Sequence, residues 1–495
     1  MTIAGATRAL PMIIQGGMGV GVSTWRLANA VSAAGQLGVV SGTALDQILA
    51  RRLQDGDPGG HMRRALVAFP FPAMAARVLD RFHVPDGKSP VASYQTLPMW
   101  SLRPPRDLQE LCIVANFVEV WLAKDGHGQA VGINYLEKIQ WPHLASIFGA
   151  MLAGVDYVLM GAGIPLKIPG VLDAYARLEP ATYSLHVSGA SPADDTLMTF
   201  SPLEFLDAPV PAPVRPRFLA IVASNTLATT MLKRANGRVD GFIVEGPTAG
   251  GHNAPPRGKL VLDDAGQPVY GERDRVDLEA LGALGVPFWL AGGYGGPEAL
   301  RQAVASGAAG VQVGTAFAYC EESGLRADLK DTIRRAVRDG EVPVRTDPLA
   351  SPTGFPFKVV AVDGTISEPR IYDERPRVCD LGYLRESYRM AGGSVGYRCA
   401  AEPVNVYVSK GGVAAETSGR KCICNALISS GGFPQVRARR HVEPAVVTSG
   451  DDLDGIRRFM LSDESVYRAS DVIQALLGPE YVPEPVGRAV VELPA

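Results

Sequence analysis

Short apolar runs recur along the first two thirds of the chain, and glycine or polar residues close each of them. Helix-sized segments such as GPEALRQAVASG (296–307) separate the runs. Continuous apolar runs are typical of parallel strands that are buried on both faces. There are eight such runs: LPMIIQGGMG (10–19), LGVVSG (37–42), AVGINYLEK (130–138), VDYVLMGAG (155–163), RFLAIVAS (217–224), VDGFIVEG (239–246), VPFWLAGG (286–293) and AGVQVGTAF (309–317).

Eight alternating strand and helix units predict an α/β fold of the (β/α)8 TIM barrel type rather than an open doubly wound sheet. The first helix is expected in TWRLANAVSAAGQLG, with Ser23 or Thr24 as its cap and Gly35 as its stop.

Two insertions interrupt this rhythm, at about 50–125 and 183–215, and the alternation ends near residue 345. We therefore expect a barrel over residues 1–345 and a carboxy-terminal module over residues 346–495. Near its end, DDLDGIRRFMLSDESVYRASDVIQALLG (451–478) resembles two amphipathic helices, which would cover the barrel or form a contact in a homodimer.

Composition and charge indicate which kinds of molecule the protein binds. Of the 495 residues, 46% are hydrophobic and 20% are charged, as in ordinary soluble globular proteins. A net charge of −3 offers no basic field for nucleic acid, so a small molecule or another protein is the expected partner. The sequence has no apolar stretch long enough for a membrane span and no signal-peptide pattern, and we expect a cytoplasmic protein.

Two predicted strand ends carry glycine-rich sequences that suit phosphate binding. The seventh run ends in glycines before a helix with Pro297 in its first turn, and the eighth ends in VGT. Barrels of this type often bind phosphate beyond these two strands. Glycines that only form tight turns are the alternative. The backbone N–H groups that would surround the phosphate belong to Gly292, Gly293, Gly314 and Thr315.

The first run ends in QGGMG (15–19). Gly16 and Gly17 remove Cβ atoms, and Met18 presents a soft apolar surface that suits a flat ring over the mouth of the barrel. A plain turn is again the alternative. A ring beside the first strand and a phosphate beyond the seventh and eighth is the arrangement that FMN requires.

These motifs together resemble the nitronate monooxygenase (2-nitropropane dioxygenase) family, which includes FMN-dependent enoyl-acyl-carrier-protein reductases on the same fold. The resemblance covers about residues 8–325 and rests on QGGMG, GIN, VEGPTAGGHN (244–253), LAGGYG and VQVGTAF, in that order. It implies FMN as cofactor. By this resemblance, Asn134, Glu245 and Gly250 would contact the flavin, and phosphate-side contacts would come from Gly293, Gln312, Gly314 and Thr315.

The AGGH sequence is the motif that points to chemistry. Its glycines, Gly250 and Gly251, would let the backbone approach the flavin, and the resemblance assigns proton transfer to His252. A single histidine after a strand is otherwise more often structural, and it can take or give a proton when it faces a substrate.

Two reactions follow from the resemblance. The first is oxidation of a nitronate or similar carbanionic substrate, with His252 as base. The alternative is reduction of an enoyl thioester, with NAD(P)H as reductant and an acyl carrier protein as candidate partner. DPLASPTGFPFKVV (347–360) resembles the larger reductases that act in trans on polyketide or polyunsaturated fatty acid synthases.

A cysteine-rich segment spans residues 379–424. Its four thiols would complete a zinc site or hold an iron–sulfur cluster, although the C-x-C spacing at its end is tighter than the usual C-x-x-C. The alternatives are reduced thiols that are neighbours only in sequence, and a redox pair. The four residues are Cys379, Cys399, Cys422 and Cys424.

Overall fold

The computed structural model describes residues 9–191, 194–340, 342–460 and 466–482. Its centre is an eight-stranded parallel sheet in the order β1-β10-β9-β8-β7-β4-β3-β2. The sheet closes on itself, because Ile14 bridges Leu37 and the Gln15 N–H donates to the Leu37 carbonyl at 2.9 Å. The fold is therefore a (β/α)8 barrel, as the sequence predicts.

Each of the eight apolar runs forms one barrel strand. The strands are β1 (Ile13–Gln15), β2 (Gly38–Ser41), β3 (Val131–Leu136), β4 (Tyr157–Gly161), β7 (Arg217–Val222), β8 (Gly241–Glu245), β9 (Phe288–Ala291) and β10 (Gly310–Val313). Side chains from alternating strand positions fill the interior, and they include Ile14, Val39, Leu159, Leu219, Ile243 and Trp289. Burial on both faces explains why the runs are apolar throughout.

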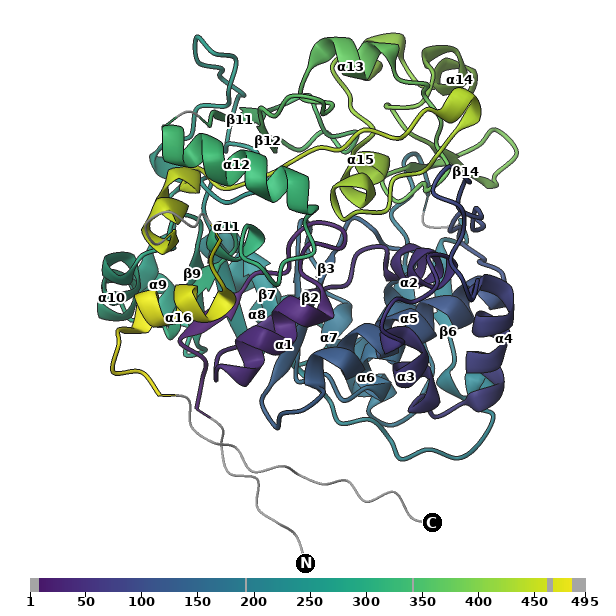
Figure 1. The fold of residues 1–495 in the computed structure, drawn as a ribbon, viewed down its shortest axis with the longest axis horizontal. Helices are drawn as coiled ribbons and strands as arrows, with labels where there is room; N and C mark the ends of the chain where they lie inside the picture. The colour runs from purple at the N-terminus through teal and green to yellow at the C-terminus, as the bar shows by residue number, and fades with distance from the viewer. Residues whose placement is uncertain (1–8, 192–193, 341, 461–465, 483–495) are drawn as a thin grey trace, which may run out of the picture.

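Helices surround the barrel (Figure 1). The first helix begins after Thr24 and ends before Gly35, whose φ of +79° favours glycine, although the Thr24 side chain makes no capping hydrogen bond. The helices up to the end of the barrel are α1 (Trp25–Ala33), α2 (Leu45–Gln54), α3 (His61–Val67), α4 (Pro72–Phe82), α5 (Arg106–Lys124), α6 (His143–Leu152), α7 (Ile168–Tyr175), α8 (Asn225–Arg234), α9 (Leu278–Gly282), α10 (Pro297–Ala305), α11 (Thr315–Ala318) and α12 (Ala327–Asp339).

Both expected insertions have structure of their own. The first holds α3 and α4 and ends in α5, a long helix that packs against α1 and α6 as a regular member of the outer ring. The second holds an antiparallel pair, β5 (Ala181–Ser184) and β6 (Leu197–Phe200), and the short 3-10 helix η1 (Pro202–Phe205).

The carboxy-terminal region lies over one end of the barrel (Figure 1). It contains two antiparallel strand pairs, short helices and a last helix that returns to pack on α1 and α10. Its elements are β11 (Val344–Asp347), β12 (Phe357–Val360), α13 (Pro369–Glu374), β13 (Glu386–Arg389), β14 (Val395–Arg398), α14 (Val404–Ser409), α15 (Ile423–Ser430), the 3-10 helices η3 (Ala414–Thr417), η4 (Ala438–Arg440) and η5 (Leu453–Phe459), and α16 (Ala469–Leu477).

The two amphipathic helices expected near the end are one α-helix and one 3-10 helix. The α-helix is α16, with Val472, Ile473 and Leu476 buried. The first expected helix is η5 instead; Gly455 weakens helix formation there, and Arg457 donates to the Val337 carbonyl of the barrel. None of the helices in the described ranges combines the length and apolarity that crossing a bilayer requires.

Candidate active site

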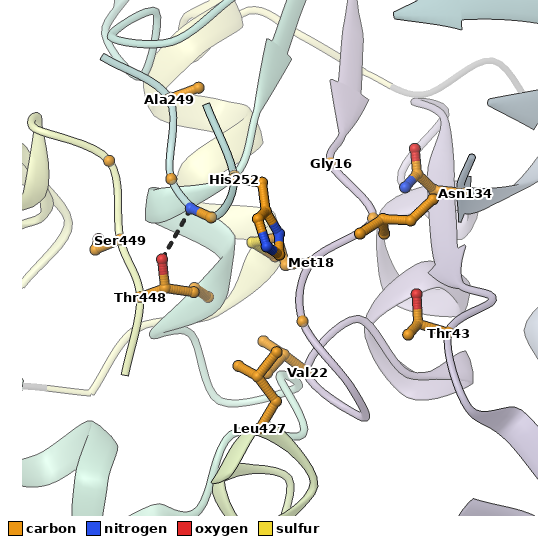
Figure 2. Close-up of a pocket in the computed structure, with 18 of the residues that line it drawn as sticks. Gly16, Met18, Val22, Thr43, Asn134, Ala249, His252, Leu427, Thr448 and Ser449 are labelled. Carbon is orange, nitrogen blue, oxygen red and sulfur yellow. Dashed lines mark hydrogen bonds between the residues drawn. The ribbon is translucent and has the colours of Figure 1, made fainter. Parts of the chain in front are cut away.

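The carboxyl ends of the barrel strands and the carboxy-terminal region enclose a cavity of about 240 Å³. Figure 2 shows His252 pointing into the space that Met18, Asn134 and Leu427 also border. Every residue expected to serve FMN or proton transfer lines this cavity: Gly16, Gly17, Met18, Asn134, Glu245, Gly250, Gly251, His252, Gly292, Gly293, Gln312, Gly314 and Thr315.

The turn after β1 has no room for larger side chains. A Cβ atom on Gly17 would lie 2.3 Å from Asn134 Cβ, so the glycine allows the turn to approach the end of β3. The Ser23 hydroxyl holds the turn, because it accepts from the Met18 N–H at 2.8 Å and donates to the Gly16 carbonyl at 2.9 Å. Met18 thereby keeps a fixed place in the cavity wall.

Two polar side chains on the cavity wall are unusual: Gln312 has a buried oxygen without a hydrogen-bond partner among the described residues, and Glu245 has a raised pKa. Gln312 Oε1 is buried and has no hydrogen-bond partner among the described residues, so it is free to accept from a ligand N–H. Burial raises the pKa of Glu245, at the end of β8, to about 7. Its carboxyl is thus close to half protonated at neutral pH.

The loops after β9 and β10 also line the cavity. Gly292 and Gly293 have φ values of +88° and +81°, which require glycine. The Thr315 hydroxyl accepts from the Gly450 N–H at 3.1 Å and also bonds Asp452, whose pKa burial raises. A raised pKa lowers the negative charge that this carboxyl places beside an anion.

The AGGH loop is fixed by the carboxy-terminal region. The Gly251 N–H donates to the Thr448 hydroxyl at 2.8 Å (Figure 2). The Gly251 carbonyl accepts from the Lys358 N–H at 2.9 Å. His252 stacks edge-on against Phe357, with ring centroids 4.9 Å apart. The loop and β12 therefore support each other.

A chain of hydrogen bonds runs from His252 to a lysine. His252 Nε2 lies 2.7 Å from Ser351 Oγ, which lies 2.8 Å from Thr353 Oγ1. Lys138 Nζ donates to the same Thr353 oxygen at 3.4 Å. Burial lowers the pKa of Lys138 to about 6, and burial together with the charge of Lys138 lowers that of His252 to about 3. The imidazole is therefore neutral at physiological pH.

The sequence patterns did not identify Lys138, Ser351 and Thr353 as site residues. Lys138 directly follows the GINYLE motif, and the other two lie in the segment after β11, which the sequence singles out only by its resemblance to larger reductases. Spacing along the chain gave no signal for the hydrogen bond between His252 and Ser351, because it spans 99 residues.

An apolar wall closes the side of the cavity that faces away from the barrel. The carboxy-terminal region supplies it, and the wall consists of Phe357, Leu381, Leu384, Ile423, Leu427, Ile428, Val446 and Val447. Apolar lining of this extent binds an apolar part of a ligand by excluding water.

The four cysteines of the cysteine-rich segment also come together. A second, small cavity inside the carboxy-terminal region is lined by Cys379, Cys399, Cys422 and Cys424. Within the described ranges, no group of three or more His, Cys, Asp or Glu side chains is arranged to hold a metal ion, so the structure does not show the zinc site. The idea that the thiols are neighbours only in sequence is wrong, since they share one cavity.

Comparison with known proteins finds a family model that matches the second half of the barrel. The family model described as nitronate monooxygenase matches residues 215–345. A Rhodococcus jostii protein named (3aS,4S,5R,7aS)-5-hydroxy-7a-methyl-1-oxo-octahydro-1H-indene-4-carboxyl-CoA dehydrogenase is 29% identical over 146 residues, which are 29% of this chain and 35% of that protein. A Bacillus subtilis "Probable nitronate monooxygenase" is 33% identical over 116 residues, 23% of this chain and 31% of the relative.

The matched stretch therefore spans about a third of the length of these relatives. Among solved structures, FabK from Thermotoga maritima aligns over 95% of this chain and 92% of its own, with 17% identity and a TM-score of 0.45. The matched residues 215–345 carry the AGGH loop and the glycine turns after β9 and β10, and over these residues the chain is similar to the nitronate monooxygenase family.

Proposed function

We propose that the cavity binds FMN, with the ring beside Gly16–Met18 and the phosphate beside the loops after β9 and β10. Three features support this. The turns that would approach the ligand consist of glycines, the buried Gln312 Oε1 has no hydrogen-bond partner among the described residues, and the glycine-rich loops after β9 and β10 line the same cavity. FMN, when bound, would accept or supply the electrons of the reaction, and the protein would supply orientation and a proton path.

We propose oxidation of a nitronate or similar carbanionic substrate as the reaction. The observation that carries the proposal is the neutral His252, which faces the cavity and is joined through two hydroxyl groups to Lys138. A neutral imidazole is the form that accepts a proton from an acidic carbon.

The hydrogen-bond chain would carry that proton away. His252 Nδ1 would take the proton from the substrate carbon while the proton on Nε2 passes to Ser351. The Ser351 proton would pass to Thr353, and the Thr353 proton to the lone pair of neutral Lys138. A lysine whose pKa is about 6 is largely neutral at pH 7 and is ready to accept it.

The apolar wall favours a second candidate, an NAD(P)H-dependent reductase of enoyl thioesters. A nitroalkane of a few carbon atoms would leave most of that wall uncovered, whereas an acyl chain would cover it. The proton would then travel in the opposite direction, from protonated Lys138 to the substrate. A chain delivered on coenzyme A or on an acyl carrier protein would suit this reaction.

An anaerobic titration distinguishes the two reactions. The purified protein, loaded with FMN, is mixed with a nitronate and, separately, with NADH or NADPH while the visible flavin band is recorded. Bleaching by the nitronate alone, reversed by air, supports the oxidation. Rapid bleaching by NAD(P)H followed by reoxidation with an enoyl thioester supports the reduction instead.

The His252→Ala variant tests the role of the histidine in proton transfer. It should bind FMN as the wild type does and should lose about 10²–10⁴-fold in turnover. A protein that takes up no FMN, or a His252→Ala variant with full turnover, contradicts the proposal.

A further inference from the structure

A buried lysine lies beside the candidate active site. The strand β12 has the sequence FKVV, and all of its residues are buried, including Lys358. A buried ammonium group is costly unless it is paired and hydrogen-bonded. Lys358 meets both conditions, because its Nζ donates to Asp451 Oδ1 at 2.6 Å and to Thr346 Oγ1 at 2.7 Å.

The main chain around Lys358 contacts the AGGH loop. The Lys358 N–H donates to the Gly251 carbonyl at 2.9 Å. On the same strand, the Val360 N–H donates to the Val447 carbonyl at 2.9 Å. Strand β12 therefore joins the AGGH loop to the segment that follows Val447.

That next segment, residues 448–452, is hydrogen-bonded to the loops that follow β8 and β10. A Cβ atom on its Gly450 would lie 2.8 Å from Thr315 Oγ1, so the approach is close. The three bonds run from the Gly251 N–H to the Thr448 hydroxyl at 2.8 Å, from the Gly450 N–H to the Thr315 hydroxyl at 3.1 Å, and from the Asp451 N–H to the Thr248 carbonyl at 3.0 Å.

The ion pair itself lies outside the candidate active site. Thr448, Ser449, Gly450 and Asp452 line the active-site cavity, but Asp451 does not. Lys358 and Asp451 instead line a separate cavity of about 360 Å³. Lys358 can therefore act on the active site only through the segments that it holds.

We propose that Lys358 is a positioning residue for the flavin site. Its ammonium group, paired with Asp451, fixes the segment 448–452 against the AGGH loop and the loop after β10. This inference rests on the proposed binding of FMN in the cavity. Without the ion pair the segment is less ordered, and the cost of ordering it is subtracted from the free energy of FMN binding.

Titration of the full-length, FMN-free protein with FMN tests this inference. Quenching of flavin fluorescence reports the binding. Lys358→Met keeps an apolar chain in place of the lysine stem and removes the charge. We expect its Kd for FMN to rise roughly tenfold to a hundredfold over the wild-type value.

A double variant shows whether the ion pair is responsible. Asp451→Asn should weaken FMN binding more than Lys358→Met does, because it leaves the buried ammonium group without its carboxylate. Lys358→Met combined with Asp451→Asn should return to the Kd of Lys358→Met alone. Effects that simply add would mean that the two side chains act separately, which contradicts the inference.

Arg375→Met is the matched control for general destabilisation. It removes another buried cation of the carboxy-terminal region, which is paired with the buried Glu443 carboxylate. Neither residue of that pair lines the active-site cavity. The variant should melt at a lower temperature and bind FMN with the wild-type Kd. An equal loss of FMN affinity in Arg375→Met and Lys358→Met would overturn the inference.

Thr346→Val keeps the experiment decisive if Lys358→Met does not fold. It removes one of the two acceptors of the ammonium group and keeps the shape of the side chain. We expect a smaller rise in the Kd for FMN than with Lys358→Met. A folded Thr346→Val variant with the wild-type Kd would count against the inference.

Hydrogen exchange of the FMN-free protein separates failure of this inference from failure of the flavin site. Backbone amides of residues 247–253 and 448–452 should exchange faster in Lys358→Met than in the wild type, and Arg375→Met should leave them unchanged. If the wild type binds no FMN, the flavin proposal fails, and exchange alone decides whether Lys358 holds the segment. Wild-type exchange of both segments in Lys358→Met would overturn the inference.

Discussion

At the scale of single residues, the surroundings of His252 decide its protonation state. An exposed histidine titrates near neutrality, whereas burial and a neighbouring lysine keep this imidazole neutral. Lys138, two hydroxyl groups away, titrates near pH 6 instead. Within the hydrogen-bond chain from His252 to Lys138, the group that titrates closest to neutrality is therefore the lysine.

This assignment predicts the pH dependence of the oxidation. Because the proton must end on neutral Lys138, kcat should rise with pH through about 6 and level off above it. Lys138→Met should remove that rise and lower the plateau about tenfold to a hundredfold. The measurement is kcat from pH 4.5 to 8.5.

The hydroxyl at position 353 can be tested with an isosteric pair. Thr353→Val keeps the shape of the side chain and removes the hydroxyl, so it should behave like Lys138→Met. Thr353→Ser keeps the hydroxyl and should retain the wild-type profile. Equal profiles for the two variants would show that no proton passes through this residue.

Glu245 links protonation to stability. Its folded pKa of about 7 lies above the ordinary value of 4.5, so the stability lost by ionising it in the fold grows as pH rises from about 4.5 to about 7, is complete above 7 and is absent below about 4.5. Glu245→Gln should therefore raise the melting temperature of the FMN-free protein at pH 8, by an amount equivalent to about 1–3 kcal/mol. The gain should vanish at pH 4.5, and a gain of equal size at both pH values would point to a cause other than ionisation.

At the scale of elements, the AGGH loop is held between the barrel and the carboxy-terminal region. A Cβ atom on Gly250 would lie 2.8 Å from the Ser449 carbonyl carbon and 3.0 Å from the Gly450 nitrogen. Both are backbone atoms, which move only with their segment. This close approach is what brings Thr448 to the Gly251 N–H.

Gly250→Ala should therefore separate the two segments. We expect the free energy of unfolding to fall by about 1–3 kcal/mol and FMN to bind more weakly. The variant should also lose its activity faster than the wild type when it is heated. Gly246→Ala is the control in the same loop, because its Cβ would meet only ordinary contacts at 3.7 and 3.9 Å. Thermal melting and flavin titration of both variants check the prediction.

The elements differ in how well their patterns predicted them. The barrel strands could be predicted from the sequence, because a strand that is buried on both faces consists of a continuous apolar run. The 3-10 helix at Leu453–Phe459 could not be predicted in this way. Its apolar spacing suits an α-helix, but Gly455 and the contacts of the segment with the barrel favour a 3-10 helix. Long-range contacts override a weak local preference there.

At the scale of the whole molecule, residues from both expected domains line the candidate active site. Residues after 345 contribute the partner of His252, the support of the AGGH loop and the apolar wall. In addition, α16 packs on α1 and α10 at the side of the barrel. The domain boundary near residue 345 stays a prediction. Because these contacts join the two parts, unfolding experiments can test whether the parts are independent.

We expect the two parts to unfold together. The five tryptophans lie between Trp25 and Trp289, so their fluorescence reports the barrel, while proteolysis within residues 346–495 reports the other part. The two probes should give one midpoint in urea, as for a cooperative unit. A folded, FMN-binding barrel released by protease would show instead that the domains are independent.

The sequence by itself determined the barrel, the order of its strands and the loops that line the cavity, because these features follow from local periodicity and from glycines at strand ends. It also marked His252 and the four cysteines as residues with chemistry. Only the tertiary structure decided what they meet. The contacts of His252 with Ser351, of Ser351 with Thr353 and of Cys424 with both cavities join segments far apart in the chain or depend on how a loop folds back. Such contacts are set by the packing of whole elements, and no residue spacing encodes them.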